Sequence, residues 1–151
     1  MDNLFETLWI YTDWANDTVL NTLESLGSNA PASSLRLMSH LVNAQKIWLN
    51  RLNDDPAVVG LWVVHPLQET RNLNTETLQG LKAAIGRFGR NPGQKVAYRN
   101  LSGVSYESPV SDVLLQVFNH GTYHRAQIAM DLRDRGLEPV NTDYITFTRI
   151  R

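Results

Sequence analysis

Three histidines stand at positions where helical spacing could bring their rings together. His120 and His124 are four residues apart, and side chains at that spacing share one face of a helix, where two imidazoles can reach one ion. Relative to Val117, taken as the centre of the apolar stripe, His124 lies roughly 20° away and His120 roughly 60° away on the same side. Both rings are therefore predicted to face the protein interior.

His40 is the candidate for a third ligand. It lies about 60° from the centre of a second helical stripe, formed by Leu37, Leu41, Ala44 and Trp48. A lone histidine on an apolar face is also explained by a hydrogen bond to a backbone carbonyl, and chance pairs at four-residue spacing are common. A buried polar group without a partner costs about 1 to 3 kcal/mol, so three converging rings favour one shared divalent transition metal.

Three neutral imidazoles suit zinc, nickel, copper or iron, and they leave a coordination position open for water or substrate. The open position favours an enzyme. The remaining histidine, His65, lies between Val64 and Pro66 in a predicted connection. We interpret it as a solvated loop residue and leave it out of the site.

Other polar residues are candidates for supporting roles. Arg125 could anchor an anionic group of a substrate, but its place on the helix flank fits a surface ion pair equally well. Gln127 or Asp131 could orient a ligand ring, and Asp13 and Asn16 could reach the interior, although polar residues on a first helix most often face water. Four tryptophans could wall a pocket or serve as ordinary core and boundary residues, namely Trp9, Trp14, Trp48 and Trp62.

Apolar residues at three- and four-residue spacing predict four helices that position these side chains. The predicted helices span residues 2–26, a segment from Ser33 or Ser34 to Asn53, a segment from Asn74 or Thr75 to Phe88, and about 109–135 with Ser111 as cap. Gly27, Gly89 and Gly136 are the predicted stops. Residues 54–73 are predicted to be irregular, and residues 96–108, with a Ser102-Gly103 turn, predict a β-hairpin. The fold class is therefore all-α, a four-helix bundle with a short β-hairpin before the last helix.

The composition sets limits on domains and partners. A chain of 151 residues with 42% hydrophobic residues predicts one domain over 1–151. Fourteen basic and fifteen acidic residues give a net charge of -1, which offers no electrostatic footprint for nucleic acid. The acidic N-terminus is unlike a signal peptide, and no stretch approaches the length of a membrane span, so we expect a cytoplasmic protein.

Cysteine is absent from the sequence, which excludes disulfides, thiolate metal ligands and a cysteine nucleophile. Any sulfur chemistry would therefore use a thiol supplied from outside the chain.

Four segments carry a resemblance to the DinB family, within the wider DinB/YfiT-like superfamily. They are YTDWAN at 11–16, HLVNAQKIWLNRL at 40–52, YESP at 106–109 and NHGTYHRAQI at 119–128. The last resembles the family signature of two histidines four apart, followed by arginine and, two residues later, glutamine. These positions fall on His120, His124, Arg125 and Gln127, and His40 matches the family's ligand on the second helix. Ala126 departs from the glycine that relatives often have.

The resemblance implies a four-helix bundle, commonly a homodimer, with nickel or zinc held by three histidines and water. It does not imply DNA polymerase activity. Characterised members of the superfamily include thiol-dependent S-transferases and a thiol-dependent isomerase, so the leading hypothesis is a metal-dependent transferase that uses a low-molecular-weight thiol. The alternatives are a hydrolase that uses metal-activated water, and a non-catalytic metal-binding or stress-response protein.

Overall fold

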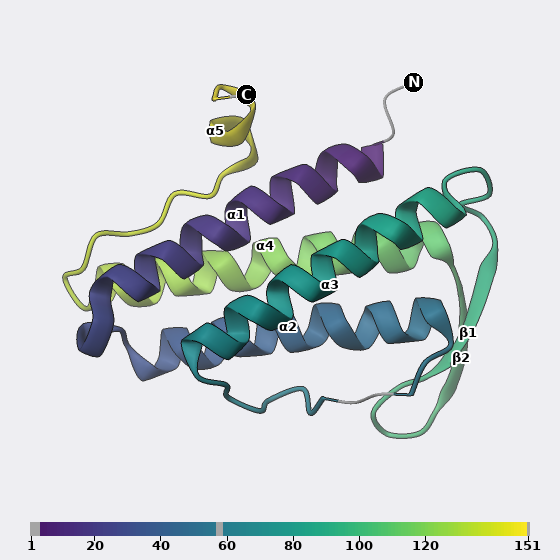
Figure 1. Cartoon of the computed structure of the whole chain (residues 1–151), viewed down its shortest axis with the longest axis horizontal. Coiled ribbons are helices and arrows are strands. Elements are labelled where there is room, and N and C mark those ends of the chain that lie inside the picture. The colour runs from purple at the N-terminus through teal and green to yellow at the C-terminus, as the bar shows by residue number, and fades with distance from the viewer. Residues whose placement is uncertain (1–3, 57–58, 151) are drawn as a thin grey trace.

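The computed structural model describes residues 4–56 and 59–150 of the chain (Figure 1). Its elements are α1 (Leu4–Leu26), the 3-10 turn η1 (Gly27–Asn29), α2 (Ala32–Asn53), α3 (Leu67–Phe88), β1 (Lys95–Arg99), β2 (Ser105–Pro109), α4 (Val110–Asp134) and α5 (Tyr144–Thr148). Four long helices and one small antiparallel sheet confirm the predicted fold class. Within these ranges no helix is long and apolar enough to cross a membrane.

The four long helices lie side by side, and α2 and α3 run in the same direction, opposite to α1 and α4 (Figure 1). The chain between α2 and α3 must therefore return along the length of the bundle. Helix α2 packs most extensively against α4 and α3, while α1 packs against α3 and α4. The segment that returns from the end of α2 to the start of α3 consequently passes along the outside of α2.

Several predicted boundaries are confirmed by backbone conformations that end a helix. Gly27 follows the end of α1 with a φ of 52°, and Gly136 follows α4 with a φ of 71°, the left-handed region that glycine adopts without steric cost. Gly89 follows α3 as predicted. The hairpin is also confirmed, with Tyr98 opposite Tyr106. The start assigned to the first helix, at residues 2–3, lies outside the described ranges.

The predicted start of the third helix was wrong, because α3 begins at Leu67 rather than at Asn74 or Thr75. These two polar residues resembled a helix cap, but both lie inside the helix. The Asn74 side chain is buried and accepts a hydrogen bond from Asn16 at 2.8 Å. The Thr75 hydroxyl donates to the carbonyl of Arg71, one turn earlier. Polar residues that bond within a bundle give the same local signal as caps.

The predicted caps of α2 and α4 were also wrong. Both helices begin after a proline without a side-chain cap. Ser33 and Ser34 lie in the first turn of α2, and both hydroxyls donate at 2.6 Å to the carboxylate of Asp131 on α4. Helix α5 was not anticipated, and it is held by Phe147, which is buried against α1.

Two apolar clusters fill the bundle, one toward the hairpin and one toward the opposite end. The first includes Leu81, Val113 and Phe118, and the second includes Leu20 and Ile128. Full burial of such side chains is the main favourable contribution to the stability of the fold.

A set of buried polar side chains joins all four helices within the bundle. Asn16 donates to Gln45 at 3.2 Å and to Asn74 at 2.8 Å, and it accepts from Arg125 at 2.9 Å. We call these four residues the polar layer. Gly121 makes room for it, because a Cβ at this position would lie 2.9 Å from an Arg125 nitrogen. Since buried polar groups need partners, the layer fixes the relative positions of the helices.

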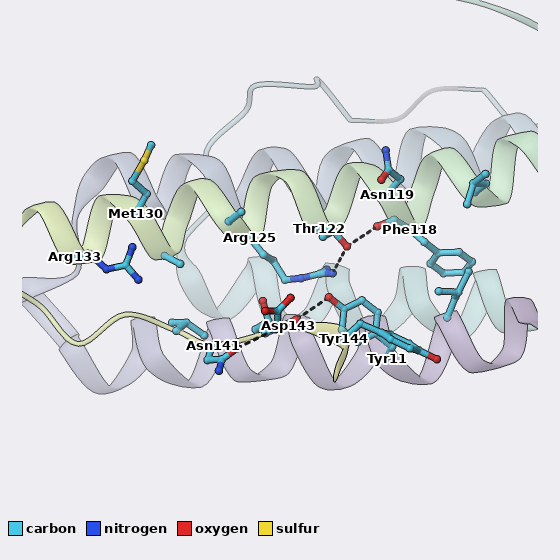
Figure 2. A pocket seen from close by; sticks show the side chains of 16 residues that line it. Tyr11, Phe118, Asn119, Thr122, Arg125, Met130, Arg133, Asn141, Asp143 and Tyr144 are labelled. Carbon is cyan, nitrogen blue, oxygen red and sulfur yellow. Dashed lines mark hydrogen bonds between the residues drawn. The ribbon is translucent and has the colours of Figure 1, made fainter. Parts of the chain in front are cut away.

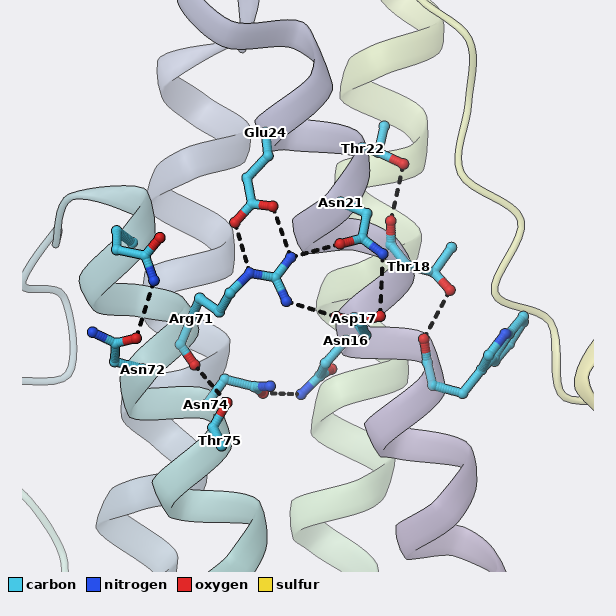
Figure 3. A network of polar contacts seen from close by, with 12 residues as sticks. Asn16, Asp17, Thr18, Asn21, Thr22, Glu24, Arg71, Asn72, Asn74 and Thr75 are labelled. Atoms are coloured by element: carbon cyan, nitrogen blue, oxygen red, sulfur yellow. Dashed lines mark hydrogen bonds and ion pairs between the residues drawn. The ribbon is translucent and has the colours of Figure 1, made fainter.

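Outside the polar layer, Arg71 of α3 binds the polar face of α1 (Figure 3). Its guanidinium contacts both oxygens of Glu24 at 2.6 and 2.9 Å, Asp17 at 2.6 Å and Asn21 at 2.7 Å. The hydrogen bond with Arg71 is the first cause of the lowered pKa of Glu24. These hydrogen bonds and ion pairs connect α3 to α1 on the surface of the bundle.

We expect the Arg71→Met substitution to lower the free energy of unfolding by about 1 kcal/mol, because three partners on α1 lose one planar donor. Urea denaturation checks this. Lys95→Met is the matched control, since it removes a single exposed ion pair with Glu107 and should change stability by less than about 0.5 kcal/mol. An equal or larger loss in the control variant would contradict the importance of the Arg71 network.

Candidate metal centre

The three predicted histidines converge between α2 and α4. The Nε2 atom of His124 lies 3.1 Å from Nε2 of His40 and 3.0 Å from Nε2 of His120. Ligand atoms of all three lie within 4.8 Å of one another. His40 and His124 are buried and His120 is half-buried. The structure therefore brings together the three residues that helical phase selected, and this group could hold a metal ion.

Two of the rings are oriented by hydrogen bonds on their other nitrogen. Nδ1 of His40 lies 3.2 Å from the carbonyl oxygen of Leu61, and Nδ1 of His124 lies 2.7 Å from Oε1 of Gln127. Because both partners are acceptors, each Nδ1 carries the proton and donates it. Each Nε2 is then left with a lone pair directed at the other rings, as metal-ligating histidines are usually arranged.

The two Nε2 separations from His124 are compatible with a shared divalent ion. Nitrogens that share one tetrahedral zinc ion at about 2.0–2.1 Å lie about 3.3 Å apart, close to the observed 3.1 Å to His40 and 3.0 Å to His120. Between His40 and His124, two lone pairs face each other with no proton to share. A cation between them removes this repulsion, whereas a hydrogen bond between the two cannot.

The pKa values of all three histidines are shifted toward the neutral form. Burial is the first cause in each case. Together with the neighbouring rings of His124 and His40, burial lowers the pKa of His120 to about 4, and the His124 ring also lowers the pKa of His40. At neutral pH the rings are therefore uncharged, which is the form that binds a transition metal.

The returning segment before α3 completes the wall around His40. The indole of Trp62 stacks on the His40 ring with centroids 3.6 Å apart and planes 15° apart. The Asn43 amide holds this segment by donating to the carbonyls of Leu61 at 3.4 Å and Val63 at 2.8 Å. His65 lies outside the three-histidine group and supports the segment instead, with Nε2 2.8 Å from Asn43 Oδ1.

The sequence did not single out two features of this wall. The Leu61 carbonyl belongs to the backbone of an irregular segment, and residue type carries no signal for it. Tyr123 precedes a predicted ligand, and its ring lies 5.0 Å from that of His124 in an edge arrangement. Of the four tryptophans, Trp62 is the one stacked on a site histidine, whereas Trp9, Trp14 and Trp48 pack elsewhere in the bundle.

Arg125 has a different neighbourhood from the histidines. Its side chain is 1% exposed, so the surface ion pair considered from the sequence was wrong. Beyond its bond to Asn16 in the polar layer, it donates to Thr122 at 3.1 Å. It also lines a cavity of about 500 Å³ between α1, α4 and the segment before α5, beside Tyr11 and Asn141 (Figure 2). None of the three histidines lines this cavity, and a role for Arg125 in binding a substrate anion stays a prediction.

The remaining polar candidates lie in different parts of the molecule. Asn16 reaches the interior, within the polar layer, and Asp13 is exposed. Asp131 bonds Ser33, Ser34 and Arg135 rather than a site histidine. Of the polar residues proposed to orient a ligand ring, Gln127 is the one that bonds a histidine of the group.

We expect His120→Ala and His124→Ala to weaken zinc or nickel binding more than the roughly 10- to 100-fold typical of losing a supporting residue, because each removes a ligand. Isothermal titration of tag-free protein measures the change. His65→Ala is the control, and it should leave the affinity within a few-fold. The reverse order of effects would contradict the ligand assignment.

Gln127→Ala should lower metal affinity by about 10-fold while leaving stoichiometry at one ion, because the His124 ring loses the acceptor that orients it. Competition with a chromogenic chelator measures this. Gln116→Ala, an exposed glutamine on the same helix, is the matched control. If both variants bind metal like the parent protein, Gln127 has no orienting role.

Comparison with known proteins identifies the family of the chain. A sequence model of the DinB family matches residues 1–151. The chain is also similar to the protein named DinB of Bacillus subtilis (strain 168), with 26% identity over 153 residues that cover 91% of this chain and 89% of that protein. With the family match spanning the whole sequence, the chain belongs to the DinB family.

Proposed function

We propose that this protein is a metal-dependent enzyme of the thiol S-transferase type, with nickel or zinc held by His40, His120 and His124. The observation that carries the proposal is the convergence of three neutral imidazole nitrogens, two of them fixed by hydrogen bonds to Leu61 and Gln127. Three ligands leave a coordination position for a further group.

The charge of the ligand set supports an anionic partner at that position. Three neutral imidazoles do not offset the charge of a divalent ion, and the group contains no Asp or Glu among the described residues. A bound divalent ion supplies Lewis acidity that favours the thiolate form of an incoming thiol. A chain without cysteine offers no competing thiolate of its own.

In the proposed reaction, the sulfur of the external thiol forms a bond to an electrophilic carbon of the second substrate. The bond from that carbon to its leaving group breaks, and the thiol proton passes to solvent. The residues of the chain hold the reactants: the histidines fix the position of the ion, and Trp62 and Tyr123, which are 47% and 61% exposed, provide apolar surface beside it.

The family resemblance also carries an expectation of a homodimer. Leu115 and Met130 are more than half exposed on α4 and line the cavity beside Arg125. This exposed apolar surface makes α4 the face on which we expect a second copy to pack.

The test is conjugation of a thiol to monochlorobimane by tag-free protein loaded with zinc or with nickel. With cysteine or glutathione as co-substrate, we expect product formation that depends on the metal and falls to the uncatalysed rate in His120→Ala. The readout is the fluorescence of the conjugate.

Absence of a metal-dependent rate across several thiols and electrophiles would contradict thiol transfer. Hydrolysis of an activated ester by the same samples would then favour metal-activated water, because the open position can also lower the pKa of water. Metal binding without either reaction would favour a role in which the ion only joins α2 to α4.

A further inference from the structure

Arg36 places a positive charge on the rim of the candidate metal centre. It lies on α2 one turn before His40, so the two side chains share a face of the helix. Its guanidinium carbon lies 4.7 Å from the centroid of the Trp62 ring, and the same indole stacks on the His40 ring with centroids 3.6 Å apart. Trp62 thus links Arg36 to a proposed ligand of the site.

The Arg36 side chain is held in place but has no acidic partner. It is exposed, and none of the ion pairs within residues 4–56 and 59–150 involves it. Other arginines, such as Arg71 and Arg135, do bind carboxylates. Stacking on an indole restrains a guanidinium while its in-plane donors stay free to bind a carboxylate.

Arg36 would add a second positive charge beside a divalent ion held by the three histidines. A divalent ion with neutral ligands and a neighbouring guanidinium would give a positive field, and the three-histidine group contains no Asp or Glu among the described residues. Such a field favours ligands that carry a second negative charge away from the atom that binds the metal.

We propose that Arg36, restrained by Trp62, is a specificity residue that selects thiols or substrates carrying a carboxylate. The ligand would place its metal-binding atom among the three histidines, its carboxylate on the guanidinium and its apolar part against the exposed edge of Trp62. This inference rests on the proposed function in naming a thiol, and the experiment below separates the two.

The test uses cobalt(II) in place of the native metal, because a thiolate bound to cobalt gives an intense absorbance band. Dissociation constants are measured for thioglycolate and for its neutral amide, mercaptoacetamide. The ratio of the two constants reports charge preference, and comparison of this ratio between variants cancels the intrinsic difference between the ligands. A second pair, imidazoleacetate and its amide, binds cobalt through nitrogen and is read from the ligand-field spectrum.

We expect Arg36→Gln to shift the ratio about two- to fivefold toward the neutral ligand in both pairs, the effect of losing one partly exposed ion pair. Arg36→Lys should retain part of the preference. Trp62→Ala should weaken it, because the guanidinium loses its support. The matched control is Arg133→Gln, which removes an exposed arginine that lines the cavity beside Arg125 and should leave the ratio unchanged.

The outcomes distinguish the two proposals. An unchanged ratio in Arg36→Gln overturns the specificity role while thiol binding stands. A shift with the imidazole pair but no binding of either thiol supports the Arg36 role and contradicts the thiol transferase. If neither pair perturbs the cobalt spectrum, the centre has no open position and both proposals fail.

Discussion

The position of α2 against α4 is the constraint on which the candidate site depends. Three imidazole nitrogens can share one ion only if their separations stay near 3 Å, and His40 comes from a different helix than His120 and His124. Apolar cores can lose a unique arrangement before they lose stability. The polar layer restricts the arrangement further, because Asn16 donates to Gln45 and accepts from Arg125 at the same time. The specificity of buried hydrogen bonds thus fixes a geometry that a shared metal ion would require.

The same arrangement gives a role to several residues that neighbour the proposed ligands in the sequence. In the segment from His120 to Arg125, the two histidines face the metal centre and Arg125 turns into the polar layer, with Gly121 leaving space for its guanidinium. Gln127 then returns to the site to orient His124. One stretch of helix therefore supplies ligands, their support and the attachment of that helix to its neighbours. We therefore expect substitutions within it to affect both the proposed metal binding and the stability of the fold.

The long helices and the three histidines could be predicted from the sequence because apolar residues recur in it at helical spacing. The apolar spacing located the four long helices, and the same period placed His40, His120 and His124 on inward faces. The start of α3 was missed because Asn74 is polar for a tertiary reason, its bond to Asn16. The roles of Leu61 and Trp62 could not be read from spacing, since they depend on the path of an irregular segment that Asn43 attaches to α2.

The most direct test of the central claim is X-ray absorption spectroscopy of tag-free protein with its metal content measured on the same sample. We predict one zinc or nickel ion per chain, with three imidazole nitrogens at about 2.0–2.1 Å for zinc and at least one further light-atom ligand. Added thiol should introduce one sulfur ligand at about 2.3 Å. A metal content that stays far below one ion per chain after reloading, or a shell with fewer than three imidazoles, would contradict the three-histidine metal centre.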